Sequence, residues 1–155
     1  MSTQLRERLT QTDRAAVIDD TVKLIDSEVS SKGGISGAVL KKGYAAVKKL
    51  KGGRMIERAV DHLLDDFADA LDPMYGTWQA KEDRPGFDRY LTDHADQATE
   101  ALLSITDEKS ERAESKIIRS TYKTLRGQAH KHVIDALPGV GRLIERHAPA
   151  QPDAT

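Results

Sequence analysis

The stretch MIERAVDHLLDDFADAL, residues 55–71, decides the fold class of this chain. Its apolar residues recur at steps of three and four, the spacing that places them along one face of an α-helix. Asp72-Pro73 follows and predicts the end of this helix, because proline disfavours the helical conformation in the residue before it. A short helical turn that carries Met74, Tyr75 and Trp78 is expected next.

The same periodicity covers most of the remaining sequence and predicts an all-α fold, a compact bundle of about six to seven helices. One domain is expected over residues 1–147, followed by a disordered tail over residues 148–155. Glycine and proline mark the helix ends. The further helices are expected over residues 12–30, 36–51, 87–107 with a break near Thr92, 117–125, 127–137, and a last short segment after Pro138-Gly139.

The composition agrees with a helical protein and excludes several kinds of site. The chain has 155 residues, of which 38% are hydrophobic, 32% charged and 5% aromatic, and a net charge of −1. There is no cysteine, which rules out disulfides, thiolate zinc sites, iron–sulfur clusters and cysteine nucleophiles. No secretory signal is recognisable at the N-terminus, and no apolar run approaches the roughly 20 residues of a membrane span. We therefore expect a cytoplasmic protein.

The two halves of the sequence resemble each other, which suggests an internal repeat of three helices over residues 12–71 and 92–147. The alternative is that any two sets of amphipathic helices align this well by chance. A repeat implies two three-helix units about a pseudo-twofold axis, and by itself it implies no activity. The matched positions include Tyr44 with Tyr122, Val47 with Leu125, and Gly53 with Gly127.

The most unusual feature is a stripe of lysines on the second expected helix: Lys41, Lys42, Lys48 and Lys49. Pairs of them are seven residues apart and lie on one side of a helix, where they would bind phosphates or an anionic membrane surface. The alternative is an ordinary solvated helix face. An acidic line on the next helix would oppose the stripe in an antiparallel hairpin, and it consists of Glu57, Asp61, Asp65 and Asp69.

Other candidate features favour a structural role. Trp78, beside Met74 and Tyr75, either plugs the end of the bundle, which we favour, or anchors an interface. The five histidines form neither a Glu-x-x-His nor a His-Glu-x-x-His pattern, and no Gly-x-Ser-x-Gly occurs. We therefore expect no metal site, no cofactor and no enzymatic activity.

Several short segments are similar to a family of small actinobacterial helical proteins that is catalogued as a domain of unknown function. The resemblance implies a bacterial, cytoplasmic, all-α protein, and it brings no activity, cofactor or catalytic residue. The segments that carry it are SKGGISG at 31–37, KGYAAVKK at 42–49, LLDDF at 63–67, KHV at 131–133 and ALP at 136–138.

Together these features predict a non-enzymatic helical interaction protein that binds a protein partner or a second copy of itself. The alternative is an anion-binding module that uses the lysine stripe on nucleic acid or on an anionic lipid surface. The candidate binding residues are Lys41, Lys42, Lys48, Lys49 and Trp78.

Overall fold

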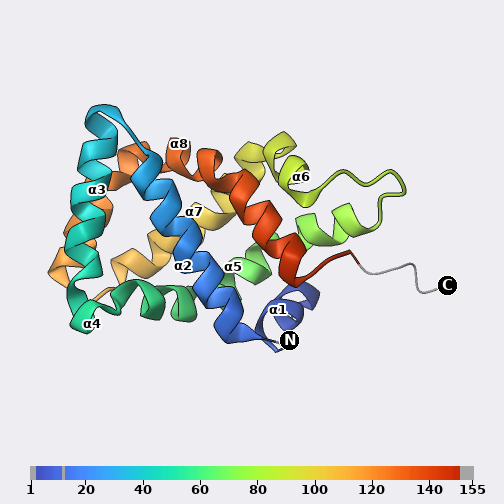
Figure 1. The fold of residues 1–155 in the computed structure, drawn as a ribbon, viewed down its shortest axis with the longest axis horizontal. Coiled ribbons are helices and arrows are strands. Elements are labelled where there is room, and N and C mark those ends of the chain that lie inside the picture. Colours follow the sequence, from blue (N-terminus) through green and yellow to red (C-terminus); the bar gives the residue numbers. More distant parts are fainter. Residues whose placement is uncertain (1–2, 12, 151–155) are drawn as a thin grey trace.

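The computed structural model describes residues 3–11 and 13–150, and within them it contains helices and no strand (Figure 1). The all-α bundle expected from the sequence is confirmed. In chain order the helices are α1 (Gln4–Thr10), α2 (Arg14–Ser31), α3 (Gly34–Lys48), α4 (Leu50–Gly53), α5 (Met55–Gln79), α6 (Phe87–Asp93), α7 (Ala95–Glu111) and α8 (Lys116–His147).

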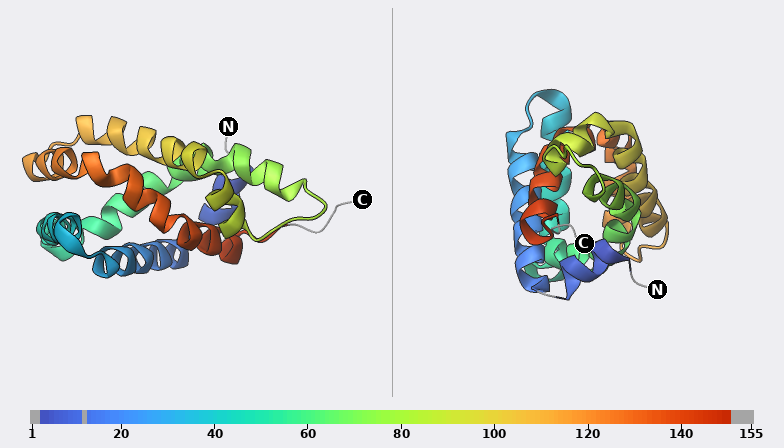
Figure 2. Two further views of the ribbon diagram at one scale, coloured as in Figure 1. Left: turned by 90° about the horizontal axis from the view of Figure 1, so that it is seen from above. Right: turned by 90° about the vertical axis from the view of Figure 1, so that its right-hand side faces the viewer.

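The helices form an elongated bundle, and α3 lies across one end of it (Figures 1 and 2). Helices α2, α5, α7 and α8 extend from that end towards the other, where α1 packs on α5 and α6 packs on α8. Because α3 contacts α2, α5 and α8, its inner side is covered and its outer side faces solvent.

Local sequence signals explain where several helices begin and turn. The Asp13 side chain caps α2 by accepting a hydrogen bond from the Ala16 amide at 3.1 Å, and aspartate is a preferred residue at this position. Lys51, Gly52 and Gly53 have φ angles of 55°, 66° and 84° and turn the chain sharply between α3 and α5. Glycine adopts this left-handed conformation without steric cost, so the predicted helix end at this position is confirmed.

Helix α5 continues through Pro73 to Gln79, so its predicted end at Asp72 is wrong. Pro73 is exposed and removes a single backbone N–H from the solvent side of the helix. The inward face continues without interruption through Leu71, Tyr75 and Trp78, all of which are buried. Burial of such large side chains stabilises by about 1.5–3 kcal/mol each, which offsets the roughly 3 kcal/mol that an interior proline costs.

Helix α8 likewise runs unbroken for 32 residues, where three shorter segments were expected. The helix continues through Gly127 and Pro138, and its apolar face is buried at Leu137 and Ile144, so packing again overrides the local breakers. By contrast, the break expected near Thr92 is confirmed, since α6 ends at Asp93 and α7 begins at Ala95.

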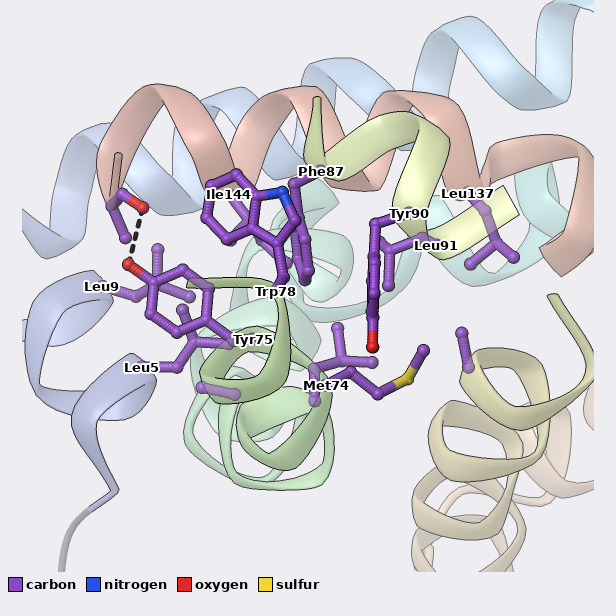
Figure 3. Close-up of a cluster of buried hydrophobic side chains, with 14 of the residues drawn as sticks. Leu5, Leu9, Met74, Tyr75, Trp78, Phe87, Tyr90, Leu91, Leu137 and Ile144 are labelled. Atoms are coloured by element: carbon purple, nitrogen blue, oxygen red, sulfur yellow. Dashed lines mark hydrogen bonds between the residues drawn. The ribbon is translucent and has the colours of Figure 1, made fainter. Parts of the chain in front are cut away.

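An aromatic cluster fills the end of the bundle away from α3 (Figure 3). The rings of Trp78 and Phe87 lie 4.9 Å apart between centroids, and those of Tyr75 and Trp78 lie 5.7 Å apart. Trp78 is 0% exposed, and its indole N–H donates to the Pro85 carbonyl at 2.7 Å. Trp78 is therefore a plug of the bundle, and the interface-anchor alternative is wrong.

The packed domain extends slightly beyond the expected boundary at residue 147. Ala148 is 0% exposed, and its carbonyl accepts a hydrogen bond from the Tyr75 hydroxyl at 2.7 Å (Figure 3). The Arg8 guanidinium donates to the Pro149 carbonyl. The expected disordered tail thus begins too early at residue 148, and its part over residues 151–155 lies outside the described residues.

Candidate functional site

The predicted lysine stripe lies on the outer side of α3, and all four of its ammonium groups are on exposed residues. Lys48 forms an ion pair with Asp26 of α2 at 3.4 Å. Among residues 3–11 and 13–150, no carboxylate lies within 4.0 Å of the Lys41, Lys42 or Lys49 ammonium. Three of the four lysines therefore keep their charge available to a ligand.

The acidic line on α5 does not face this stripe, so the predicted pairing of the two is wrong. Three of its four carboxylates bind two arginines near the N-terminus instead: Arg14 contacts Asp61 and Asp65 at 2.9 Å each, and Arg6 contacts Asp65 and Asp69 at 3.2 Å each. Hydrogen bonds from Arg14, and then from Arg6, lower the pKa of Asp65. These pairs hold α1 and the start of α2 against α5, so Asp61, Asp65 and Asp69 do not neutralise the lysine stripe.

The lysine stripe belongs to one of two segments that contain no acidic residue. Residues 29–56 hold seven lysines and arginines, and residues 115–134 hold five, while neither segment holds an aspartate or glutamate. The whole chain has 24 basic and 25 acidic residues. Half of the positive charge is therefore gathered in two segments without any negative charge, although the net charge is close to zero.

These two segments pack against each other at the end of the bundle (Figure 2). The contact centres on Gly43 of α3, where a Cβ atom would lie 2.9 Å from Cγ2 of Thr121 and 3.3 Å from Cδ1 of Leu125. The exposed and unpaired lysines on the α3 side of this contact form what we call the basic face. Its members are Lys41 and Lys42 of α3 and Lys49, which follows the end of α3. The exposed Arg119 and Lys123 of α8 instead line a groove with Asp107 and Glu111 of α7.

Exposed aliphatic side chains accompany the basic face. Ile35 is 87% exposed, Val39 41% and Ile117 46%, and these are the large hydrophobic residues that stand out in solvent within the described chain. Val39 and Ile117 lie one helical turn before Gly43 and Thr121, so each is on the side of its helix that borders the α3–α8 contact. This end of the molecule therefore combines basic and apolar side chains with the exposed carboxylates of Glu111 and Glu114 at the α7–α8 junction.

A tyrosine and a basic residue, one turn apart, bind a carboxylate on the neighbouring helix in each half. In the first half, Tyr44 and Lys48 both donate to Asp26. In the second half, Tyr122 donates to Asp107, and Arg126 contacts Asp107 at 2.7 Å. Tyr44 and Tyr122 are 78 residues apart, as are Lys48 and Arg126. Lys48, a predicted binding residue, is thus partly engaged in holding α3 to α2.

Burial is the largest influence on these tyrosines and, with the hydrogen bond to Asp107, raises the pKa of Tyr122 to about 12. The pKa of Tyr44 is raised for the same two reasons, with Asp26 as the acceptor. Hydrogen bonds from Arg126 and then from Tyr122 lower the pKa of Asp107. Both tyrosines stay neutral at neutral pH and donate their hydroxyl protons, which suits a structural role.

Two open grooves lie beside this region, and both have lining residues of mixed charge. The larger, about 640 Å³, is lined by Ile18, Arg54, Glu57, Arg58, Asp61 and His62. The second, about 460 Å³, lies between α7 and α8 and contains Asp107 and Arg126. Within the described residues, no three histidine or carboxylate side chains are placed to hold one metal ion.

Sequence patterns identified the lysines of the basic face and missed the second acid-free segment, residues 115–134, which packs against α3. Lys116, Arg119 and Lys123 were overlooked because they are spaced by three and four residues among apolar and polar neighbours, without the visible doublets of α3. The absence of any carboxylate over residues 115–134 was the available signal.

Fold and sequence together define a small helical bundle in which two acid-free segments pack against each other at one end. The chain belongs to DUF6918, a family of unknown function, whose model matches residues 5–148. No curated protein and no solved structure matches the chain. Among the described helices, none has the length and apolar character required to cross a membrane.

Proposed function

We propose that this protein is a non-enzymatic binding module and that its basic face docks on a polyanionic partner in the bacterial cytoplasm. One observation carries this proposal: two acid-free segments meet at one end of the bundle, and three of the α3 lysines have no carboxylate nearby. Charges of one sign that are gathered on one surface add their potentials and attract an oppositely charged partner, even when the net charge is near zero.

The proposal predicts binding that weakens steeply as salt is added, because cations that neutralise phosphates or carboxylates release counterions. Retention on immobilised heparin, a soluble polyanion, measures this directly. The test variant is Lys41→Glu/Lys42→Glu/Lys49→Glu, and the expected result is loss of retention at low salt.

A matched control changes the net charge equally at other places. Lys23, Arg89 and Arg112 are 71%, 78% and 74% exposed and lie outside the basic face. Their triple change to glutamate should leave retention near the wild-type value. Equal loss of retention in both variants would show that overall charge, and not the basic face, determines binding.

A protein partner or a second copy of this chain is the second candidate, and the exposed aliphatic side chains favour it. Ile35, Val39 and Ile117 would be covered in such an interface. Sedimentation velocity over a range of concentrations tests self-association, which should decrease in Val39→Ser/Ile117→Ser. A strict monomer at all concentrations would contradict the second-copy form of this candidate.

We also propose that the halves 12–71 and 92–147 are an internal repeat. Equivalent contacts support this: Tyr44 and Tyr122 each bind a carboxylate of the preceding long helix, and the matched positions Gly43 and Thr121 meet at the centre of the α3–α8 contact. Tyr44→Phe and Tyr122→Phe should lower the free energy of unfolding by similar amounts, about 1 kcal/mol each. A large effect from one and none from the other would argue against equivalent roles.

A further inference from the structure

The ring of His132, on α8, is hidden from water and makes no hydrogen bond. Both of its nitrogens are buried, and neither has a hydrogen-bond partner within residues 3–11 and 13–150. A neutral imidazole leaves one donor and one acceptor unused in this position, at a moderate cost in free energy. An imidazolium there would be a buried charge without an acceptor, which is far more costly. The packed structure therefore accommodates the neutral ring and opposes the charged one.

The corner between α2 and α3 (Figure 1) brings a second cation to this ring. Directly after α2, the Lys32 side chain is only 13% exposed, and its ammonium contacts Glu28 at 3.5 Å and Asp135 of α8 at 3.1 Å. Burial, and after it the charge of Lys32, lowers the pKa of His132. On α8 itself, Asp135 opposes this shift and Lys131 adds to it. Asp135, three residues after His132 on the same helix, is therefore placed to bind either cation.

Two glycines give this corner the freedom to move. Gly33 and Gly34 stand between the last turn of α2 and the body of α3, and a Cβ atom on either would meet nothing within 4 Å. Gly34 has a φ angle of 71°, a conformation that glycine adopts without steric cost. The first turn of α3, in contrast, is pressed against the end of α2, since a Cβ atom on Gly37 would lie 2.7 Å from the Lys32 carbonyl carbon. Lys32 and the first turn of α3 therefore move together.

We infer that His132 is a pH-sensitive latch for the α2–α3 corner. At neutral pH the uncharged ring stays buried, and Lys32 binds Asp135. In mildly acidic solution a ring nitrogen takes up a proton from solvent, and the two adjacent cations repel each other. The corner then separates from α8, the imidazolium reaches water, and Asp135 exchanges Lys32 for His132 as its partner. Proton uptake thereby loosens the start of the helix that carries Lys41 and Lys42. This latch does not depend on the proposed polyanion binding.

The test is amide hydrogen exchange of the full-length protein, followed by NMR at pH 7.5 and pH 5.5. Each rate is divided by the intrinsic rate at the same pH, which gives a protection factor. Protection over residues 30–40 should fall about fivefold or more at the lower pH, because an ordinary imidazole, with a pKa of about 6.5, is then about nine-tenths protonated. Constant protection in the wild type would overturn the inference.

Low concentrations of urea separate opening of the corner from unfolding of the whole chain. Local opening exposes little surface, so exchange over residues 30–40 should not respond to urea, while exchange at the centre of α5 should accelerate. An equal response of both regions would show that the corner amides exchange only through global unfolding, and the latch would then be wrong.

Two substitutions identify the groups involved. In His132→Leu no proton is taken up, so protection of the corner should be the same at both pH values. In the control His130→Leu, on the same helix but with a 42% exposed side chain, the decrease should persist. Asp135→Asn should lower protection of the corner already at pH 7.5, whereas Asp19→Asn, in an exposed pair with Lys23, should not. Thermal unfolding confirms that each variant folds. A decrease that survives in His132→Leu, or unchanged protection in Asp135→Asn, would contradict the latch.

Discussion

Gly43 of α3 lies directly against Thr121 of α8, with space for a hydrogen atom and for nothing larger: a Cβ atom on Gly43 would be 2.9 Å from the threonine Cγ2. This contact joins the two acid-free segments, so the shape of the basic face depends on it. We expect Gly43→Ala to move the helices apart and to destabilise the fold.

The methyl group of Thr121 is the specific obstacle, so Thr121→Ser should relieve the strain in Gly43→Ala. We expect the double variant to recover about 1 kcal/mol or more of the loss relative to additivity. Urea unfolding of the four proteins in this double-mutant cycle measures the coupling. Additive effects would show that α3 and α8 are not in direct contact at this position.

Gly141 allows α8 to pack on α6, and here the neighbour is backbone. A Cβ atom would lie 2.5 Å from the Asp88 nitrogen and 2.8 Å from the Phe87 carbonyl carbon. Because backbone cannot rotate away, Gly141→Ala should destabilise by about 2–3 kcal/mol. In Gly127→Ala, on the same helix, the new Cβ meets nothing within 4 Å, and this variant should instead stabilise by about 0.5–1 kcal/mol.

Trp78 fills the aromatic end of the bundle, so its loss should destabilise the protein strongly. Trp78→Ala removes a fully buried side chain and should lower the free energy of unfolding by about 3–5 kcal/mol. Trp78→Phe keeps a smaller aromatic ring in the cluster and loses the hydrogen bond to Pro85, so a smaller effect is expected. Denaturant unfolding followed by circular dichroism compares the three proteins, and a near-neutral Trp78→Ala would contradict the core position.

The positions of the helices could be predicted from the sequence more accurately than the residues at which they end. The stripe of residues 55–71 predicted the buried face of α5, because helical periodicity is a local property. The continuation through Pro73 depends on Tyr75 and Trp78 finding partners in α6, a tertiary effect that no local pattern contains. Helix α8 continues through Pro138 for the same reason, because buried residues on both sides of the proline pack against other helices.

Only part of the candidate site could be predicted from the sequence, because the rest again depends on tertiary packing. The Lys41–Lys49 stripe is visible as doublets, whereas its contact with α8 arises from the packing of distant segments. The acidic line on α5 was assigned to the wrong partner because α1, which carries Arg6, was not expected as a helix. Because α1 packs on α5, Arg6 and Arg14 lie within ion-pair distance of Asp61, Asp65 and Asp69.

His132 should make stability depend on pH near neutrality. Both of its ring nitrogens are buried without a hydrogen-bond partner, and desolvation, followed by the nearby charge of Lys32, lowers its pKa. Asp135 opposes this shift and Lys131 adds to it. The unfolded chain therefore binds a proton more readily than the folded one, and the free energy of unfolding should fall as pH drops below about 6.5.

The variant His132→Leu removes this titration, and its stability should vary less between neutral and mildly acidic pH. Urea unfolding at several pH values compares it with the wild type. His62→Leu, on another helix, is the control and should leave the wild-type pH dependence in place. Parallel curves for wild type and His132→Leu would contradict the assignment.

The unpaired lysines on the outer side of α3 have a consequence for how the protein behaves on charged supports. Lys41, Lys42 and Lys49 are exposed, although the net charge of the chain is −1. Charges of one sign that are gathered locally attract an opposite surface even when the net charge is small. The protein should therefore be retained by cation-exchange resin at a pH where its net charge is negative, because retention depends on the arrangement of its charges and not on their sum.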